Sequence, residues 1–266
     1  MNILYVGDVM AEMGITVVEQ ILPKLREEKQ VDLIVAQAEN VSDGKGMTPA
    51  DMQRLQKAGV DFFTGGNHTP TKEELVPLLE DNEQPVIGPA NMSMCPGRGW
   101  KYANTPKGKV LVVSLLGGTV GREVAIENPL KAIDKILADN QGVDRVATIV
   151  NFHGDYSSEK VIIGHYLDGR ASLVVGDHWH VPTADVQVLP KGTAHMTDVG
   201  MCGSLDSSLG VTFDSVVPRW RDEMQTRNII EASGRMQFNA LLAEIDEGTG
   251  QAKSVEYIRK IIAQIT

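Results

Sequence analysis

Short apolar runs alternate with amphipathic stretches through the first eighty residues of the chain. Residues 2–6 (NILYV) form an apolar run that predicts a buried strand, and residues 15–26 have the periodicity of a helix. The same order recurs twice. A strand at 32–36 is followed by a helix at 48–57 with proline in its first turn, and a strand at 60–63 is followed by a charged helix at 72–80. Three consecutive strand-loop-helix units indicate an α/β fold whose first sheet is largely parallel.

The rest of the chain divides into three stretches. Residues 85–106, rich in proline and glycine, predict a long connection with edge strands rather than a domain linker. Strands at 110–116, 147–152 and 171–175 then alternate with helices at 129–139 and 157–166. From about residue 186 the segments are short and alternating, which predicts antiparallel strands and hairpins at 186–189, 193–197 and 236–245. No repeat or charge block divides the sequence, so we expect a single domain over residues 1–266.

Composition and charge narrow the functions that such a chain can have. With 266 residues, of which 42% are hydrophobic and 23% charged, it can bury a full core. A net charge of -10 argues against stable nucleic-acid binding, which needs clustered Lys and Arg. A small anionic substrate is still compatible with that charge, because bound metal ions reverse the local field.

The two cysteines and the apolar content predict the compartment. Cys95 and Cys202 are far apart and form no C-x-x-C pair, so we expect neither a disulfide framework nor a thiolate zinc site. The N-terminal segment has neither a basic start nor a long apolar stretch, and no apolar run approaches a membrane span. We therefore expect a cytoplasmic protein without membrane contact. Symmetric assemblies are common among enzymes, which is our reason for expecting a homo-oligomer.

Polar side chains with metal-binding chemistry follow five of the predicted strands. They are Asp8, Glu39, Asn40, Asn67, His68, His153, His178 and His180. In an open α/β sheet the loops at the carboxyl ends of the strands converge on one crevice. Carboxylate, amide and imidazole groups together are what manganese, iron and zinc accept. The pattern therefore predicts a metal site in that crevice.

Each of the early candidates also has a simpler explanation. Asp8 fits a helix N-cap, and Glu39 with Asn40 fits a turn. The two glycines before Asn67 fit a turn as well, although a turn does not call for His68. None of these positions would indicate a metal site if it occurred alone.

The histidines make the joint pattern stronger than its parts. On an extended chain His178 and His180 would face the same way, a chelating geometry that also arises by chance in surface loops. Four of the six histidines nevertheless fall in these strand-end loops, together with two acids and two asparagines. The other two, His165 in a predicted helix and His195 in a predicted strand, we assign to structural roles.

Other catalytic motifs are weak or missing in the sequence. Gly7 and Gly14 lack the G-x-G-x-x-G spacing of a dinucleotide loop, and the sequence has no P-loop. Ser204 and Ser207 do not form the G-x-S-x-G elbow of a serine hydrolase. Residues 96–99 (PGRG) resemble an anion-binding turn, but a structural turn is the safer interpretation.

Six longer motifs run through nearly the whole chain. They are GDVM at 7–10, AENVSDGKGMT at 38–48, GGNH at 65–68, NFHGDYSSEK at 151–160, GDHWHVPTAD at 176–185 and LPKGTAHMTDVGMCG at 189–203. With these motifs the chain resembles the calcineurin-like metallophosphoesterases and, within them, the YmdB-type branch. The resemblance implies a four-layer α/β/β/α sandwich with a dinuclear iron or manganese centre. It also implies hydrolysis of small phosphodiesters, in this branch 2′,3′-cyclic nucleotides.

The resemblance also implies a role for each candidate. One metal would be held by Asp8, Asn40 and His180, and the other by Asn67, His153 and His178. Glu39 would bridge the two metals. Two metals about 3.5–4 Å apart polarise a phosphoryl oxygen and acidify a bridging water into the nucleophile. His68 would be the general acid that protonates the leaving alkoxide, since histidine titrates near neutral pH.

The chain departs from the branch around the predicted centre while keeping every metal position. Thr69-Pro70-Thr71 follows the GGNH motif where the branch usually has an aromatic residue and an acid, and Ile15 stands where an arginine is common. Gly154-Asp155 follows His153 where the branch usually has a small residue and glutamate. Asp177 and Trp179 stand where the branch has smaller polar residues. Such positions set ligand orientation and substrate choice, so we expect an effect on specificity and rate.

Three other functions stay open at this point. A phosphomonoesterase would use the same centre, and a metal-loaded regulatory module would bind substrate without turning it over. A nicotinamide oxidoreductase is suggested only by the α/β pattern, and the missing glycine fingerprint disfavours it.

Overall fold

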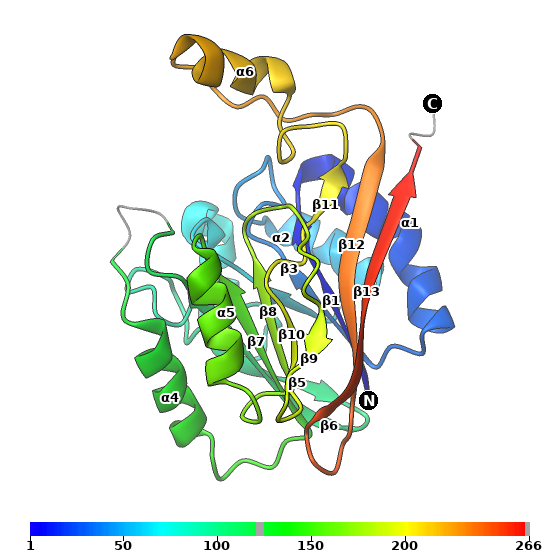
Figure 1. Cartoon of the computed structure of the whole chain (residues 1–266), viewed down its shortest axis with the longest axis vertical. Helices are drawn as coiled ribbons and strands as arrows, with labels where there is room; N and C mark the ends of the chain where they lie inside the picture. Colours follow the sequence, from blue (N-terminus) through cyan, green and yellow to red (C-terminus); the bar gives the residue numbers. More distant parts are fainter. Residues whose placement is uncertain (121–124, 264–266) are drawn as a thin grey trace.

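Two β-sheets lie face to face in the computed structural model, which describes residues 1–120 and 125–263, and helices cover their outer faces (Figure 1). The first sheet contains β1 (Asn2–Val6), β2 (Asp8–Val9), β3 (Leu33–Gln37), β4 (Phe62–Thr64), β11 (Met201–Ser204), β12 (Met236–Ile245) and β13 (Ala252–Ile262). The predicted strands β1, β3 and β4 are parallel to one another. The sheet as a whole is mixed rather than largely parallel, because the C-terminal hairpin adds β12 antiparallel to β1.

The second sheet is also mixed. It contains β5 (Trp100–Thr105), β6 (Gly108–Leu116), β7 (Ala147–His153), β8 (Leu173–Asp177), β9 (Gln187–Val188) and β10 (Ala194–Met196). Strands β6, β7, β8 and β10 are parallel, and antiparallel β5 and β9 form the edges. The antiparallel hairpin predicted at 186–189 and 193–197 is confirmed by the pairing of β9 with β10. On its other side β10 is parallel to β8, a pairing made through a crossover that short sequence windows do not reveal.

The predicted helices are present, with two corrections. The helices are α1 (Ala11–Glu28), α2 (Pro49–Lys57), α3 (Val76–Glu80), α4 (Pro129–Asp139), α5 (Ser157–Tyr166) and α6 (Phe213–Asp222). The expected helix at 72–80 is divided into the 3₁₀ turn η2 (Glu73–Leu75) and α3, after the 3₁₀ turn η1 (Thr69–Thr71). Pro77 lies in the first turn of α3, where proline favours a helix start over continuation. Helix α6 was not predicted and lies between β11 and β12.

Three apolar layers hold the sandwich together. Along β1, Leu4 and Val6 face the layer between the first sheet and its helices, whereas Ile3 and Tyr5 face the layer between the sheets. This alternation is the two-residue period of a strand that is buried on both faces. A third layer joins the second sheet to the helices through residues such as Ile133 of α4. The four-layer α/β/β/α arrangement expected from the resemblance is confirmed.

None of the helices in the described residues has the length and apolar content needed to cross a membrane.

Candidate metal centre

All eight predicted site residues lie at the carboxyl ends of five strands. Asp8 follows β1, Glu39 and Asn40 follow β3, and Asn67 and His68 follow β4 in the first sheet. His153 is the last residue of β7, and His178 and His180 follow β8 in the second sheet. The strand ends of the two facing sheets thus supply opposite sides of one site.

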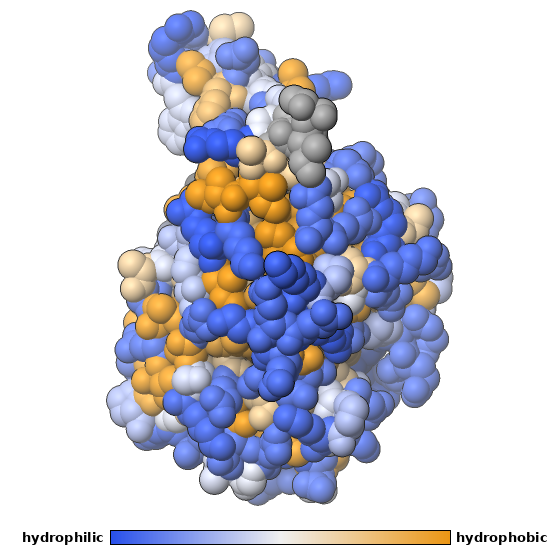
Figure 2. Space-filling model, turned by 90° about the vertical axis from the view of Figure 1, so that its right-hand side faces the viewer, coloured by the Kyte–Doolittle hydropathy of each residue, from blue (hydrophilic) through white to orange (hydrophobic). Residues whose placement is uncertain are grey.

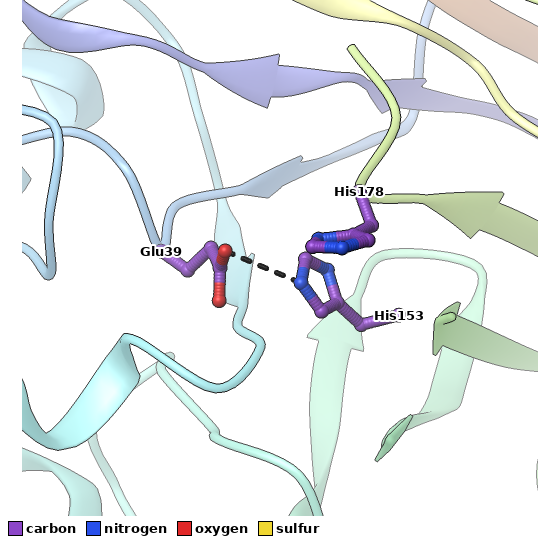
Figure 3. A group of neighbouring side chains, drawn as sticks. All are labelled: Glu39, His153 and His178. Carbon is purple, nitrogen blue, oxygen red and sulfur yellow. Dashed lines mark ion pairs between the residues drawn. The ribbon is translucent and has the colours of Figure 1, made fainter. Parts of the chain in front are cut away.

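Glu39 joins the two sides. Its Oε1 lies 3.2 Å from His153 Nε2, across the gap between the sheets (Figure 3). Asn40 Nδ2 donates a hydrogen bond of 3.3 Å to the same oxygen, and the backbone N–H of His68 donates one of 2.9 Å to Oε2. The ring of His178 packs edge-on against that of His153, with 4.5 Å between centroids. A single buried carboxylate is therefore in contact with groups from three of the five loops.

A second cluster lies around Asp8. His180 Nε2 is 3.8 Å from Asp8 Oδ1 and 3.2 Å from Asn40 Nδ2. The backbone N–H of His178 donates a 3.3 Å hydrogen bond to Asp8 Oδ2. His180 Nδ1 lies 3.1 Å from the carbonyl of Leu209, which can only accept, so Nδ1 carries the proton. The lone pair of Nε2 then faces the Asp8 carboxylate and is available for a metal.

Asp177 is a residue of the site that the sequence analysis missed as a functional group. Its Oδ1 lies 2.6 Å from His153 Nδ1, and its Oδ2 accepts hydrogen bonds from the Tyr5 hydroxyl at 3.0 Å and from Asn151 Nδ2. With Nδ1 held by Asp177, the opposite nitrogen of His153 points at Glu39. The available signal was an acid at the end of an apolar strand, immediately before the two histidines.

The backbone around the paired histidines differs from the extended geometry assumed for them. His178 has a φ of +101° and His180 a φ of +61°, which are left-handed conformations that non-glycine residues rarely adopt. As a result the two imidazoles reach different partners, His153 for one and Asp8 for the other. Such strain persists only where the surroundings enforce it and is concentrated at functional sites.

Two buried charges enforce this backbone. Lys160 Nζ donates to the carbonyl of Asp177 at 2.6 Å and to Asp198 Oδ2 at 2.5 Å. The same Asp198 oxygen accepts the backbone N–H of Trp179 at 3.0 Å. The indole ring of Trp179 covers the Lys160 ammonium, whose nitrogen lies 4.0 Å from the ring centroid. Trp179, which replaces a smaller polar residue of the branch, therefore shields the ion pair that fixes the histidine loop, by which we mean residues 177–185.

Electrostatics in the site favour an ionised Glu39 and neutral imidazoles at His178 and His180. Burial opposes ionisation of Glu39, but the charge of His153 outweighs it and lowers the pKa of Glu39 to about 2. Burial, followed by the charge of His153, lowers the pKa of His178 to about 3, and burial also lowers the pKa of His180. Neutral imidazoles and an ionised carboxylate are the forms that bind metals.

His153 and Asp8 shift in the opposite direction. Burial lowers the pKa of His153, but the charges of Glu39 and Asp177 outweigh burial, so that its pKa lies well above the ordinary value. Burial and the nearby Asp177 carboxylate raise the pKa of Asp8 well above the ordinary value. A cation between these groups would let both acids ionise and take the place of the imidazole proton.

Unpaired buried atoms test whether a cation fits. In residues 1–120 and 125–263, six buried side-chain nitrogen or oxygen atoms have no hydrogen-bond partner, and three of them are Asp8 Oδ1, Asn67 Oδ1 and His153 Nε2. Buried polar atoms are normally paired, so this grouping in predicted ligands needs a cause. Ligand atoms of Glu39, His153 and His178 lie within 4.8 Å of one another, as do those of Asp8, His153 and Asp177. The donor set fits divalent or trivalent metal ions.

Comparison with known proteins places this chain in a family. The family model described as YmdB-like protein matches residues 4–258. The chain belongs to the YmdB-like family. A relative from Bacillus subtilis (strain 168), named 2′,3′-cyclic-nucleotide 2′-phosphodiesterase, is 35% identical over 260 residues, which is 97% of this chain and 96% of the relative. The family membership expected from the six motifs is thus confirmed.

Solved structures share the fold of this chain. A novel phosphatase from Mycoplasma pneumoniae has a TM-score of 0.92 at 28% identity and covers 99% of this chain and 94% of its own. A hypothetical protein from Thermus thermophilus has a TM-score of 0.88 at 34% identity, covering 98% and 100%. A 5′-nucleotidase precursor from the same organism, with a TM-score of 0.53 at 11% identity, covers 99% of this chain and 54% of its own and shares the fold.

Proposed function

We propose that this chain is a dinuclear-metal phosphodiesterase that hydrolyses small phosphodiesters, with 2′,3′-cyclic nucleotides as its substrates. The observation that carries the proposal is the set of unpaired buried atoms on Asp8, Asn67 and His153, which lie among strand-end loops from two facing sheets. The name of the Bacillus subtilis relative supports the choice of substrate.

We assign the metal ligands as the resemblance implies. One ion would be held by Asp8, Asn40 and His180 and the other by Asn67, His153 and His178, and Glu39 would be shared between them. The contacts of Asp8 with His180 and of Glu39 with His153 support this division. Carboxylate, amide and imidazole ligands accept iron or manganese, the metals that the resemblance implies. When bound, two such ions polarise a phosphoryl oxygen and supply a hydroxide nucleophile.

His68 is the general acid in this proposal. Its backbone N–H is anchored to Glu39 Oε2, which fixes the residue beside the bridging position. Burial lowers the pKa of His68 although the charge of Glu39 opposes this, and Lys45 lowers the pKa further. In the reaction the imidazolium would give its proton to the leaving alkoxide and then take another from water. Asp177 would keep His153 oriented, with Nδ1 occupied and Nε2 aimed at the metals.

Metal stoichiometry measured together with hydrolysis tests this function. The wild-type chain and Glu39→Gln would be reconstituted with iron or manganese, and metal per chain and 2′,3′-cyclic AMP hydrolysis would be measured on the same samples. We expect two metals per wild-type chain, fewer in Glu39→Gln, and hydrolysis that follows the metal content. The absence of stoichiometric metal in the wild type would overturn the proposal.

A phosphomonoesterase with the same centre is the second candidate, because the structural relative from Mycoplasma pneumoniae is called a phosphatase. A panel of cyclic diesters and the corresponding 2′- and 3′-monophosphates separates the two activities by their kcat/KM values. Stoichiometric metal and substrate-induced stabilisation without turnover on any of them would instead favour the regulatory module.

We further propose that residues 1–266 form one metallophosphoesterase domain that assembles into a homo-oligomer. A single cooperative unfolding transition tests the first statement. Light scattering at several protein concentrations tests the second, and a monomeric mass throughout would overturn it.

A further inference from the structure

A cavity of about 450 Å³ is lined by Met10, two residues after Asp8, and by a loop that begins three residues after Asn40. One wall is the loop of residues 43–45, and the other is the arm, by which we mean residues 205–235 between β11 and β12. The arm carries α6 and rises beyond the strand ends (Figure 1). It stands clear of the body in the side view, with apolar surface gathered at its base (Figure 2).

Backbone hydrogen bonds tie both walls to predicted metal ligands. On the loop side, the N–H of Gly46 donates to the carbonyl of Glu39, and the N–H of Ala11 donates to the carbonyl of Asn40 at 3.0 Å. On the arm side, the carbonyl of Leu209 accepts from the ring of His180 at 3.1 Å. Both walls of the cavity are therefore held by the loops that carry predicted metal ligands.

Three cations line this cavity. Arg219 is fixed on the arm, where its Nε donates to Thr226 Oγ1 at 2.7 Å and its Nη2 donates to Asn228 Oδ1. The side chains of Lys45 and Arg227 make no hydrogen bond or ion pair with any part of the chain that the structure describes, so their charges are available to a ligand. In a chain of net charge -10, a cavity with three cations is a local reversal of sign.

Among the described residues of the lining, Asp43 is the one acid, and it does not cancel these charges. Asp43 is highly exposed, and its carboxylate pairs with Lys72 Nζ at 3.2 Å. The remaining lining includes the apolar side chains of Met10, Val211 and Ile230, which pack together. Apolar surface beside cations suits a ligand with a flat apolar part and a phosphate, which describes a nucleotide.

The substrate assigned to the metal centre leaves these cations without an anion. A 2′,3′-cyclic mononucleotide has a single phosphate, and that phosphate must lie at the metals to be hydrolysed. We propose that the cavity binds a second phosphate-bearing nucleotide unit, so that the preferred substrate is a short oligonucleotide, a dinucleotide at least, ending in a 2′,3′-cyclic phosphate. This inference rests on the proposed phosphodiesterase function.

Arg227→Ala tests the proposal through the ratio of the kcat/KM values for two substrates, a dinucleotide and a mononucleotide. We expect the wild-type kcat/KM to be about tenfold or more higher for the adenylyl dinucleotide with a terminal 2′,3′-cyclic phosphate than for 2′,3′-cyclic AMP, as one charge-assisted contact provides. In Arg227→Ala this ratio should fall towards one, mainly through the KM for the dinucleotide. Arg221, which is exposed on α6 and pairs with Asp222, is outside the cavity lining, so Arg221→Ala should keep the wild-type ratio.

A binding measurement separates this inference from the catalytic proposal. Metal-depleted protein would be titrated calorimetrically with adenosine 3′,5′-bisphosphate and with adenosine 3′-monophosphate. We expect the wild type to bind the bisphosphate at least about tenfold more tightly, and Arg227→Ala to lose that difference. Suppose that neither cyclic phosphate is hydrolysed, but the difference in affinity between bisphosphate and monophosphate is lost in Arg227→Ala. Then only the proposed activity is overturned. Equal affinity for the two probes, or a substrate ratio near one in the wild type, overturns the inference itself.

Discussion

Asp177 Oδ1 lies 2.6 Å from His153 Nδ1, and both side chains are fully buried between the two sheets. The other Asp177 oxygen accepts from Tyr5 and Asn151. Both carboxylate oxygens are therefore occupied by protein donors, which makes Asp177 an orienting partner of the imidazole rather than a bridging ligand. Carboxylate partners of this kind fix the tautomer of a metal-binding histidine and raise its basicity.

Replacement of this carboxylate by an amide should weaken metal binding. For Asp177→Asn we expect a loss of about 10–100-fold in metal affinity, because the amide cannot hold the Nδ1–H tautomer as strongly. Competition with a chelator of known affinity measures the change. Asp144→Asn is the matched control, since Asp144 is an exposed acid outside the predicted site residues. Unchanged affinity in Asp177→Asn would contradict the orienting role.

His68 should affect turnover rather than metal content. In His68→Gln we expect kcat for 2′,3′-cyclic AMP to fall by about 10²–10⁴, the usual contribution of a general acid. The loss should be much smaller with bis(p-nitrophenyl) phosphate, because p-nitrophenolate leaves without a proton. His165→Gln, at an exposed position in α5, serves as the control. Equal losses on the two substrates would assign His68 to binding rather than to proton transfer.

Most of the framework was predictable because local rules and tertiary packing agree. Strand β1 and helices α4 and α5 have the predicted limits. The start of α4 is marked by the Asn128 cap, whose side chain accepts from the N–H groups of residues 130 and 131. The placement of site residues at strand ends followed from the same rule, since parallel strands bring their carboxyl ends to one edge.

The remaining features depend on contacts between distant residues. Helix α6 packs Val216 against the body, but Phe213 and Trp220 are largely exposed, and so the clear pattern that reveals buried helices is missing. The left-handed backbone at His178 and His180 depends on Lys160 and Asp198, which lie outside any local window. For that reason the spacing of two histidines predicted an extended geometry that the molecule does not have.

Gly66 provides a steric test of the site. A Cβ at this position would collide with Glu39 Oε2 and would lie 2.6 Å from ring atoms of His153. We expect Gly66→Ala to displace one of these side chains, reduce the metal bound per chain, and destabilise the fold by about 1–3 kcal/mol. Gly142→Ala is the control, because a Cβ there meets nothing within 4 Å. Full metal content in Gly66→Ala would show that Glu39 and His153 are not jointly required.

The buried pair of Lys160 and Asp198 should matter for stability. In Lys160→Met the Asp198 carboxylate stays buried without its partner, so we expect the free energy of unfolding to fall by about 3–5 kcal/mol in urea titrations. Adding Asp198→Asn to this variant removes the stranded charge and should recover part of the loss. Lys135→Met, on the exposed side of α4, should change little. A loss below about 1 kcal/mol in Lys160→Met would indicate that the pair is not important for folding.

Asp185 gives the histidine loop a predictable pH dependence. Its carboxylate accepts from Thr183 Oγ1 at 2.6 Å and from Thr197 Oγ1 at 2.5 Å. Burial raises the pKa of Asp185, but these hydrogen bonds outweigh it, and the pKa lies below the ordinary value. The unfolded chain therefore binds the proton more readily, and the stability from this carboxylate is nearly complete above about pH 4.5. It is lost as the pH falls through the lowered pKa of the folded state.

The difference in unfolding free energy between the wild type and Asp185→Asn isolates this effect, because all other titrating groups are common to both proteins. We expect a constant difference from pH 7 down to about pH 4.5 and a shrinking one below about pH 4. Urea unfolding followed by circular dichroism at several pH values measures it. A difference that stays the same down to about pH 3 would mean that the hydrogen bonds of Asp185 do not favour its ionised form.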